Sequence, residues 1–297
     1  EPVRYADRHA EMAQRLGFDV SHIVRATQHV PLCLRGSAHQ ESRKRLAGLI
    51  GARTGAVREV VAAKLPELMT VLLTPGRRDV MNSFVYPLVD ALMTAMIDID
   101  VKFEADSMVS RIFSQSIGVS KRRRMNAELG ALHVHIRAQK PDLTEDEIGD
   151  RVALCILGTD AMRGTLGYSL HRMFTDPSFT LETDLSYPPC TGVPYIDGEA
   201  IKQVQIADEG YQEGDVFRAW LKGFESIEGK AAKQRFFGFG SHTCLGRKLA
   251  LEIWQMMAAQ LHENRIEVVV LAFTKRRDDV FDIPQTFEIE VLACPKS

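Results

Sequence analysis

The chain has 297 residues, of which 45% are hydrophobic and 26% charged, a composition that supports a sizeable core and argues against disorder. Its formal net charge of -2 at pH 7 gives no global attraction to nucleic acid or to a membrane surface, and no apolar run approaches the roughly 18 residues that cross a bilayer. The start lacks signal-peptide character. The five cysteines lack the CxxC spacing of a zinc site, so we expect a cytoplasmic protein without a disulfide framework.

Apolar residues recur at helical spacing in five segments of the first half of the chain. These segments are 5–17, 38–50, 53–73, 78–96 and about 122–138. Gly51, Pro75 with Gly76, and Pro141 separate them and predict breaks between helices.

The clearest helix is expected to begin at Thr144 and to end near Phe174. Thr144 and Glu147 have the spacing of a capping box, in which each residue satisfies a free backbone N–H of the other. The segment is apolar on nearly every side, which predicts a helix in the middle of the molecule.

After residue 177 the sequence becomes irregular, with short strand-like pieces near 201–206 and 215–221. A final helix is expected from just after Cys244 to about His262, followed by a closing β-pair, 266–273 with 286–293. No convincing linker interrupts the chain. We therefore expect one mainly α domain over residues 1–297, with a small β region.

The glycine-rich loop around Cys244 comes immediately before that last helix. A helix N-terminus presents unpaired N–H groups and the positive end of the helix dipole, and both stabilise a thiolate. Gly240 and Gly246 would permit backbone conformations that turn further amides toward the sulfur. One thiolate without a nearby second ligand suits the axial position of a haem iron better than zinc. The alternative is a buried structural cysteine at a helix start.

The spacing Phe237-x-x-Gly240-x-His242-x-Cys244-x-Gly246 resembles the haem-binding signature of bacterial cytochromes P450. The resemblance implies a truncated P450-like helical fold that binds heme b. It also implies that Cys244 is the axial iron ligand, that Phe237 shields its sulfur and that His242 reaches a haem propionate.

His39 and Arg43 lie four residues apart, on one face of an expected helix. Two donors so placed could clamp a carboxylate. The pair resembles the His-x-x-x-Arg helix that holds haem propionates in the same family. The alternative is an ordinary solvated basic face.

Gly158, Ala161 and Thr165 fall on one face of the long helix at spacings of three and four. Their small side chains would let a flat cofactor and a diatomic ligand approach. The segment resembles the oxygen-activating turn of the family, with Asp160 as the acid, but Ala161 stands where the alcohol would be. Making Thr165 the alcohol would lose the acid. The alternative is that Asp160 satisfies a kink in a buried helix.

Two parts of the family pattern are missing from this sequence. The helix with Glu-x-x-Arg that locks the core behind the haem is absent, as is most of the N-terminal sheet and first helix. Another device must then stabilise the proximal side, and homo-oligomerisation would be one.

Three functions remain open on the sequence. The first is oxidation of a small organic substrate in bacterial secondary metabolism. A ferredoxin or flavodoxin would supply the electrons, docking near Arg45, Arg247 and Lys248. The second is a redox-neutral or peroxide-using reaction, as in a dehydratase, isomerase or peroxygenase, and the third is haem binding without catalysis. The basic run 121–124 would mark a solvated helix start, or bind an acidic substrate or a carrier protein.

Overall fold

The computed structural model describes residues 2–114, 116–177, 185–206, 208–227, 229–264, 267–276 and 280–292. The chain groups into two compact units, here called unit 1 and unit 2. Unit 1 comprises Glu1–Leu49, Asp106–Leu157 and Tyr195–Trp220, and unit 2 comprises Ile50–Ala105, Gly158–Pro194 and Leu221–Ser297. The single domain expected over 1–297 stays a prediction.

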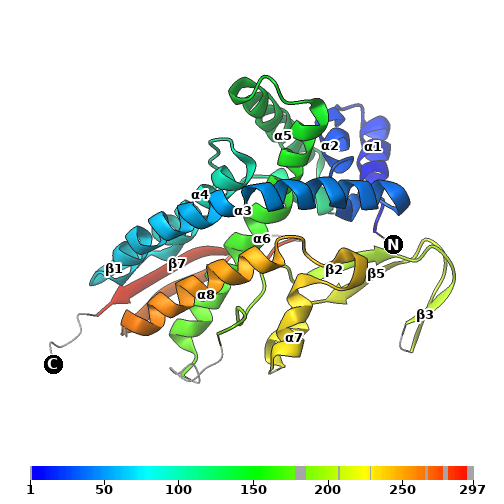
Figure 1. The fold of residues 1–297 in the computed structure, drawn as a ribbon. Helices are drawn as coiled ribbons and strands as arrows, with labels where there is room; N and C mark the ends of the chain where they lie inside the picture. Colours follow the sequence, from blue (N-terminus) through cyan, green and yellow to red (C-terminus); the bar gives the residue numbers. More distant parts are fainter. Residues whose placement is uncertain are drawn as a thin grey trace. The chain divides into compact units, whose positions relative to one another are not determined.

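Unit 1 is built mainly from helices, with two short β-ladders. Its elements are α1 (Tyr5–Leu16), α2 (Ser21–Thr27), η1 (Pro31–Cys33), the first part of α3 (Gly36–Leu73), η3 (Val109–Phe113), α5 (Val119–Gln139), the first part of α6 (Glu145–Thr175), β2 (Tyr195–Glu199) paired with β5 (Val216–Trp220), and β3 (Val204–Ile206) paired with β4 (Glu209–Tyr211). Both pairs are antiparallel (Figure 1).

A close approach of α2 to α5 organises the core of unit 1. A Cβ on Gly130 of α5 would lie 2.7 Å from the ring of His22, so only glycine leaves room there. Oδ1 of Asn126, on α5, accepts hydrogen bonds from the backbone N–H groups of His22 and Ile23 at 3.0 and 3.1 Å. These bonds satisfy donors in the first turn of α2, which has no side-chain cap of its own.

Unit 2 combines the remaining helices with a three-stranded sheet. It contains the rest of α3 and α6, β1 (Gly76–Asp79), the π-helical turn η2 (Met81–Val85), α4 (Tyr86–Ile97), η4 (Lys222–Ser226), α7 (Lys230–Gln234), η5 (Arg235–Phe237), η6 (Gly240–His242), α8 (Arg247–Asn264), β6 (Val268–Lys275) and β7 (Pro284–Val291). The strand order is β1-β7-β6, with both neighbouring pairs antiparallel. Phe84, Phe287 and Trp254 are among its largest fully buried side chains.

The long helix α6 agrees with the sequence analysis. Thr144 and Glu147 form the capping box: the backbone N–H of Thr144 donates to the Glu147 carboxylate at 2.8 Å, and that of Glu147 donates to Thr144 Oγ1 at 3.2 Å. Five successive residues from Val152 to Ile156 are buried. The helix is therefore enclosed on all sides over this stretch, as its composition predicted.

The expected break at Gly51 is wrong, because α3 is one continuous helix of 38 residues (Figure 1). A Cβ at Gly51 would meet nothing within 4 Å, so the residue lies in open space on the helix surface. A glycine there costs only about 1 kcal/mol relative to alanine. Buried Val57, Val61 and Leu65 continue the apolar face beyond it.

The other boundaries also differ in part. Residues 76–79 form strand β1, paired with β7, rather than the start of a helix over 78–96, and α4 itself begins at Tyr86. The strand-like pieces near 201–206 and 215–221 are β3 and β5, whose partners β4 and β2 were missed. The closing pair is confirmed as β6 and β7. Among the described residues, no helix has both the length and the apolar character to cross a bilayer.

Candidate functional site

Cys244 lies in a tight loop that leads into α8, as the sequence predicted. Its backbone N–H donates to the carbonyl of Phe237 at 2.7 Å, which closes the loop. The N–H of Arg247, the first residue of α8, donates to the Cys244 carbonyl at 3.3 Å. The Cys244 side chain is exposed. The alternative of a buried structural cysteine is therefore wrong.

Glycines shape this loop in two ways. Gly238 and Gly240 have φ values of 74° and 56°, a region that glycine adopts without the strain of a side chain. Gly240 therefore has the unusual backbone expected of it, its effect on the sulfur stays a prediction, and the need for glycine at Gly238 was missed. Gly246 has no positive φ, so the expected unusual backbone there was wrong. A Cβ on Gly246 would lie 3.9 Å from the Cys244 sulfur, and glycine leaves this side of the sulfur uncovered.

The remaining signature residues belong to the same loop. Phe237 is half-buried, and its ring lies 6.4 Å from that of Tyr187 in an edge-on arrangement. His242 is half-buried at the end of the turn Gly240–His242. Arg247 donates to the Tyr187 hydroxyl at 3.2 Å, which anchors the start of α8. The roles of Phe237 and His242 toward haem stay predictions.

Two of the other three described cysteines, Cys155 and Cys190, contrast with Cys244 in being buried. Cys155 lies inside α6 and is fully buried, and burial raises the pKa of its thiol to about 12. Burial likewise raises the pKa of Cys190 to about 12. Neither thiol can therefore supply a thiolate at neutral pH.

His39 and Arg43 both lie on α3 within unit 1. His39 is buried and Arg43 is half-buried. They occupy one helix face, as expected from their spacing, and their binding of propionates stays a prediction.

Arg45, expected in a basic docking patch, is ion-paired with a carboxylate of unit 1, and its docking role stays a prediction. Its Nε donates to the two carboxylate oxygens of Asp150, at 3.0 and 3.2 Å. His29 also contacts Asp150, with Nδ1 at 3.2 Å from the same carboxylate. Arg45 therefore forms an ion pair within unit 1, and its partner Asp150 is buried. Lys248 remains exposed in unit 2.

Asp160, the expected acid of the oxygen-activating turn, is held in an ion pair. Arg276 donates to its Oδ2 at 2.9 Å, and the guanidinium of Arg163 lies 3.8 Å from its Oδ1. The residue is 2% exposed. It lies inside α6, which runs from Glu145 to Thr175, and the alternative that Asp160 satisfies a kink stays a prediction.

Arg163 extends this ion pair into a buried network. Its side chain is fully buried and donates to Asp90 at 3.0 Å and to the carbonyls of Phe103 and Glu104 at 2.7 and 3.1 Å. Burial raises the pKa of Asp90, although the neighbouring Arg163 acts in the opposite direction. Arg276 also donates to the carbonyl of Ala105 at 2.9 Å. Two arginines and two aspartates therefore join α4, α6 and the residue after β6.

Sequence reasoning missed three members of this network. Arg163 offered one signal, a charged residue within a helix that is otherwise apolar on most sides. Asp90 and Arg276 offered none, because nothing local marks the partner of a residue distant in the chain. The network supplies buried ion pairing in a chain that lacks the family's Glu-x-x-Arg helix.

The small-residue face of α6 is partly covered by the protein itself. The Thr165 hydroxyl accepts a hydrogen bond from the backbone N–H of Gly192 at 2.9 Å. A Cβ on Gly192 would lie 2.7 Å from the carbonyl oxygen of Ala161 and 2.6 Å from the nitrogen of Thr165. A Cβ on Gly158 would lie 3.1 Å from the sulfur of Met93. Gly158, Ala161 and Thr165 are all half-buried, and the approach of a flat cofactor along this face stays a prediction.

Comparison of this structure with solved protein structures identifies the fold. P450BioI in complex with an acyl carrier protein ligated to hexadec-9Z-enoic acid aligns with a TM-score of 0.74 at 14% identity, over 92% of this chain and 84% of that one. The cytochrome P450 CYP109B1 from Bacillus subtilis aligns with a TM-score of 0.66 at 14% identity, over 89% and 86%. This chain has a cytochrome P450-like fold.

These similarities confirm the P450-like fold that the sequence resemblance implied, mainly α with a small β region. CalO2 is similar to the chain as well, with a TM-score of 0.73 at 15% identity over 97% of this chain and 86% of that one. No protein-family model matches the sequence, and no curated protein matches it significantly. The likeness to P450 enzymes is therefore one of structure at low sequence identity.

Proposed function

We propose that this P450-like chain binds heme b through the sulfur of Cys244 and oxidises a small organic substrate, for example by hydroxylation. The observation that carries the proposal is the loop itself. It holds an exposed sulfur between a closed turn and the first residue of an 18-residue helix. The amides and dipole at this helix start favour the thiolate form that iron needs.

The residues present fit such a cofactor on its thiolate side. Cys244 would be the iron ligand. Because Gly246 has no side chain, it leaves space beside the Cys244 sulfur. Phe237 would pack beside the sulfur, while His242, His39 and Arg43 would bind the propionates as charged or polar donors. A haem bound through this thiolate would supply the electron density that favours O–O cleavage.

A second candidate is a redox-neutral or peroxide-using reaction, as in a dehydratase, isomerase or peroxygenase. Delivering protons to dioxygen normally needs a positioned acid and a hydroxyl. Here Asp160 is ion-paired with Arg276, Ala161 has no hydroxyl, and the Thr165 hydroxyl accepts from Gly192. A reaction without that relay loses nothing from this arrangement. For the first candidate, a water or a substrate hydroxyl would have to complete the relay.

Partners follow from the same proposal. Electrons for the oxidation would come from a ferredoxin or flavodoxin. P450BioI is seen bound to an acyl carrier protein, and a carrier would be a possible partner of the basic run at the start of α5. In that run Arg124 pairs with Asp106 and Glu128, and Arg122 is buried, which leaves Lys121 and Arg123 as exposed cations.

The decisive experiment is the absorption spectrum of the reduced protein with carbon monoxide. Wild type and a Cys33→Ala control should give the same thiolate-ligated signature, and Cys244→Ala should lose it. Unchanged haem content and an unchanged spectrum in Cys244→Ala would overturn the proposal.

Turnover then separates the functions. Product that requires reductant, O₂ and a ferredoxin supports the oxidation, whereas product formed under argon without reductant, or with peroxide alone, supports the second candidate. A spectral response to ligands without product under any of these conditions would assign haem binding without catalysis.

A further inference from the structure

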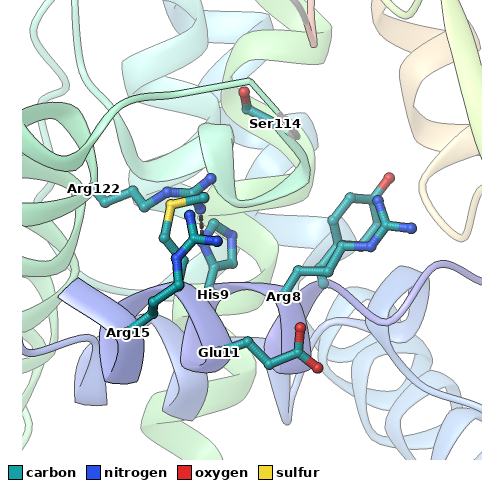
Figure 2. A pocket seen from close by; sticks show the side chains of 8 residues that line it. Arg8, His9, Glu11, Arg15, Ser114 and Arg122 are labelled. Atoms are coloured by element: carbon teal, nitrogen blue, oxygen red, sulfur yellow. Dashed lines mark hydrogen bonds between the residues drawn. The ribbon is translucent and has the colours of Figure 1, made fainter.

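Unit 1 contains a pocket of about 370 Å³ that includes none of the residues proposed to hold haem (Figure 2). It lies between α1, residue Ser114 after η3, and Arg122 of α5. Its volume falls within the range of small-molecule sites, about 300–1,000 Å³. The pocket is large enough for a small organic molecule.

The pocket wall carries an excess of positive charge. Arg8, Arg15 and Arg122 line it together with one carboxylate, Glu11. In Figure 2 the side chains of Arg15 and Arg122 both extend toward the ring of His9, whereas Glu11 extends away from it. An anion that contacts both guanidinium groups would be attracted by their charges and would accept hydrogen bonds from both.

His9 orients Arg122 without cancelling its charge. The imidazole is buried, and its two nitrogens contact Arg122 Nη1 and, at 2.9 Å, the carbonyl of Ile112. Because the guanidinium can only donate, Nδ1 accepts and Nε2 carries the proton that goes to the carbonyl. Burial lowers the pKa of His9 to about 4, and Arg122 contributes in the same direction, so the ring is neutral near pH 7. This contact therefore holds the Arg122 guanidinium in the wall of the pocket.

Apolar groups complete the lining. Tyr5 is buried and its ring stands edge-on to Phe113, with ring centres 5.5 Å apart. Met12, one turn before Arg15 on α1, is half-buried. The ring and the thioether offer contact surface for a hydrocarbon body next to the cationic end.

We propose that this pocket binds a small organic anion, a carboxylate or a phosphate ester on a short apolar body. Arg15 and Arg122 bind the anionic oxygens, and Tyr5 and Met12 contact the apolar part. Planar guanidinium groups suit both headgroups, since each offers paired N–H donors to paired oxygens. None of the pocket residues is proposed to bind haem, so anion binding can be tested independently of the function proposed above.

The test is isothermal titration calorimetry of the full chain with benzoate, phenyl phosphate and uncharged benzamide. The variant is Arg15→Gln, an exposed position at which loss of charge does not threaten the fold. The matched control is Lys121→Gln, which removes one positive charge from an exposed position on α5 that does not line the pocket.

At least one of the two anions should bind wild type and Lys121→Gln with equal affinity, and Arg15→Gln should bind it about tenfold more weakly or worse, the effect of losing a charge-assisted hydrogen bond. The tighter of the two anions identifies the preferred headgroup. Absence of binding by both anions, equal affinity in Arg15→Gln, or benzamide binding as tightly as benzoate would each overturn the proposal.

Discussion

Arg276 Nη2 lies 2.9 Å from Asp160 Oδ2, although the two residues are 116 positions apart. The pair fixes the middle of α6 to the residue that follows β6. It also gives the carboxylate a permanent cationic partner at the position where the family resemblance implied a proton donor. This ion pair should therefore affect both the stability of unit 2 and the chemistry available at Asp160.

Arg276→Gln should destabilise the protein by about 3 kcal/mol, because it leaves the buried Asp160 carboxylate without its closest cation. The urea midpoint of unfolding measures the loss. Adding Asp160→Asn should recover part of it, since the uncompensated charge then disappears. Arg77→Gln, which removes an exposed arginine from β1, serves as the control and should leave the midpoint nearly unchanged. An Arg276→Gln midpoint equal to that of the control would contradict the ion-pair account.

Ala161→Thr tests whether dioxygen is activated. The new hydroxyl would stand next to Asp160 and raise the fraction of electrons that end in product. Because Asp160 stays bound to Arg276, the gain should remain below the roughly hundredfold of a complete acid–base relay. Product formed per electron pair consumed is the measurement. Ala161→Val has the same shape without the hydroxyl, so equal coupling in the two variants would argue against the oxidation and for the second candidate.

Gly192→Ala should destabilise unit 2 by about 3 kcal/mol or more, at the upper end of overpacking effects. Its Cβ would lie under 3 Å from three backbone atoms of α6, and none of these can move aside like a flexible side chain. Thermal or urea unfolding gives the value. In Gly118→Ala the new Cβ would meet nothing within 4 Å, so its stability should match wild type. Equal stabilities for both alanine variants would show that residue 192 does not pack directly on the helix.

His9 should make the stability of the protein depend on pH below neutrality. Its pKa falls from 6.5 to about 4 on folding because of burial, so the unfolded chain takes up a proton first as the pH drops. The stabilising effect is complete above pH 6.5 and is lost progressively toward pH 4, over a range of about 3 kcal/mol.

Unfolding free energies at several pH values, for wild type and His9→Gln, check this expectation. The glutamine variant should show a shallower decline between pH 6.5 and 4. His135→Gln replaces an exposed histidine and should decline like wild type. A His9→Gln curve parallel to wild type would mean that the buried ring does not titrate in this range.

How far the sequence predicts this molecule depends on how local each feature is. The Cys244 loop was predictable, because its turn glycines and the helix that follows are adjacent in the chain. The capping box at Thr144 was predictable for the same reason. Gly51 wrongly predicted a helix break, because glycine ends a helix only where tertiary contacts do not hold it. The buried face of α3 continues beyond Gly51. The Arg276 ion pair depends on a distant contact that no local pattern records.

The position of Cys244 outside the core also affects how the protein must be handled. Thiolates, not thiols, react with electrophiles. The thiols of Cys155 and Cys190, with pKa values near 12, stay protonated and shielded in the folded state. Alkylating reagents would therefore reach the exposed Cys244 well before either of them. A preparation treated with iodoacetamide before reconstitution would carry a carboxamidomethyl group on the sulfur proposed to bind iron, and its failure to take up haem would say nothing about the native chain.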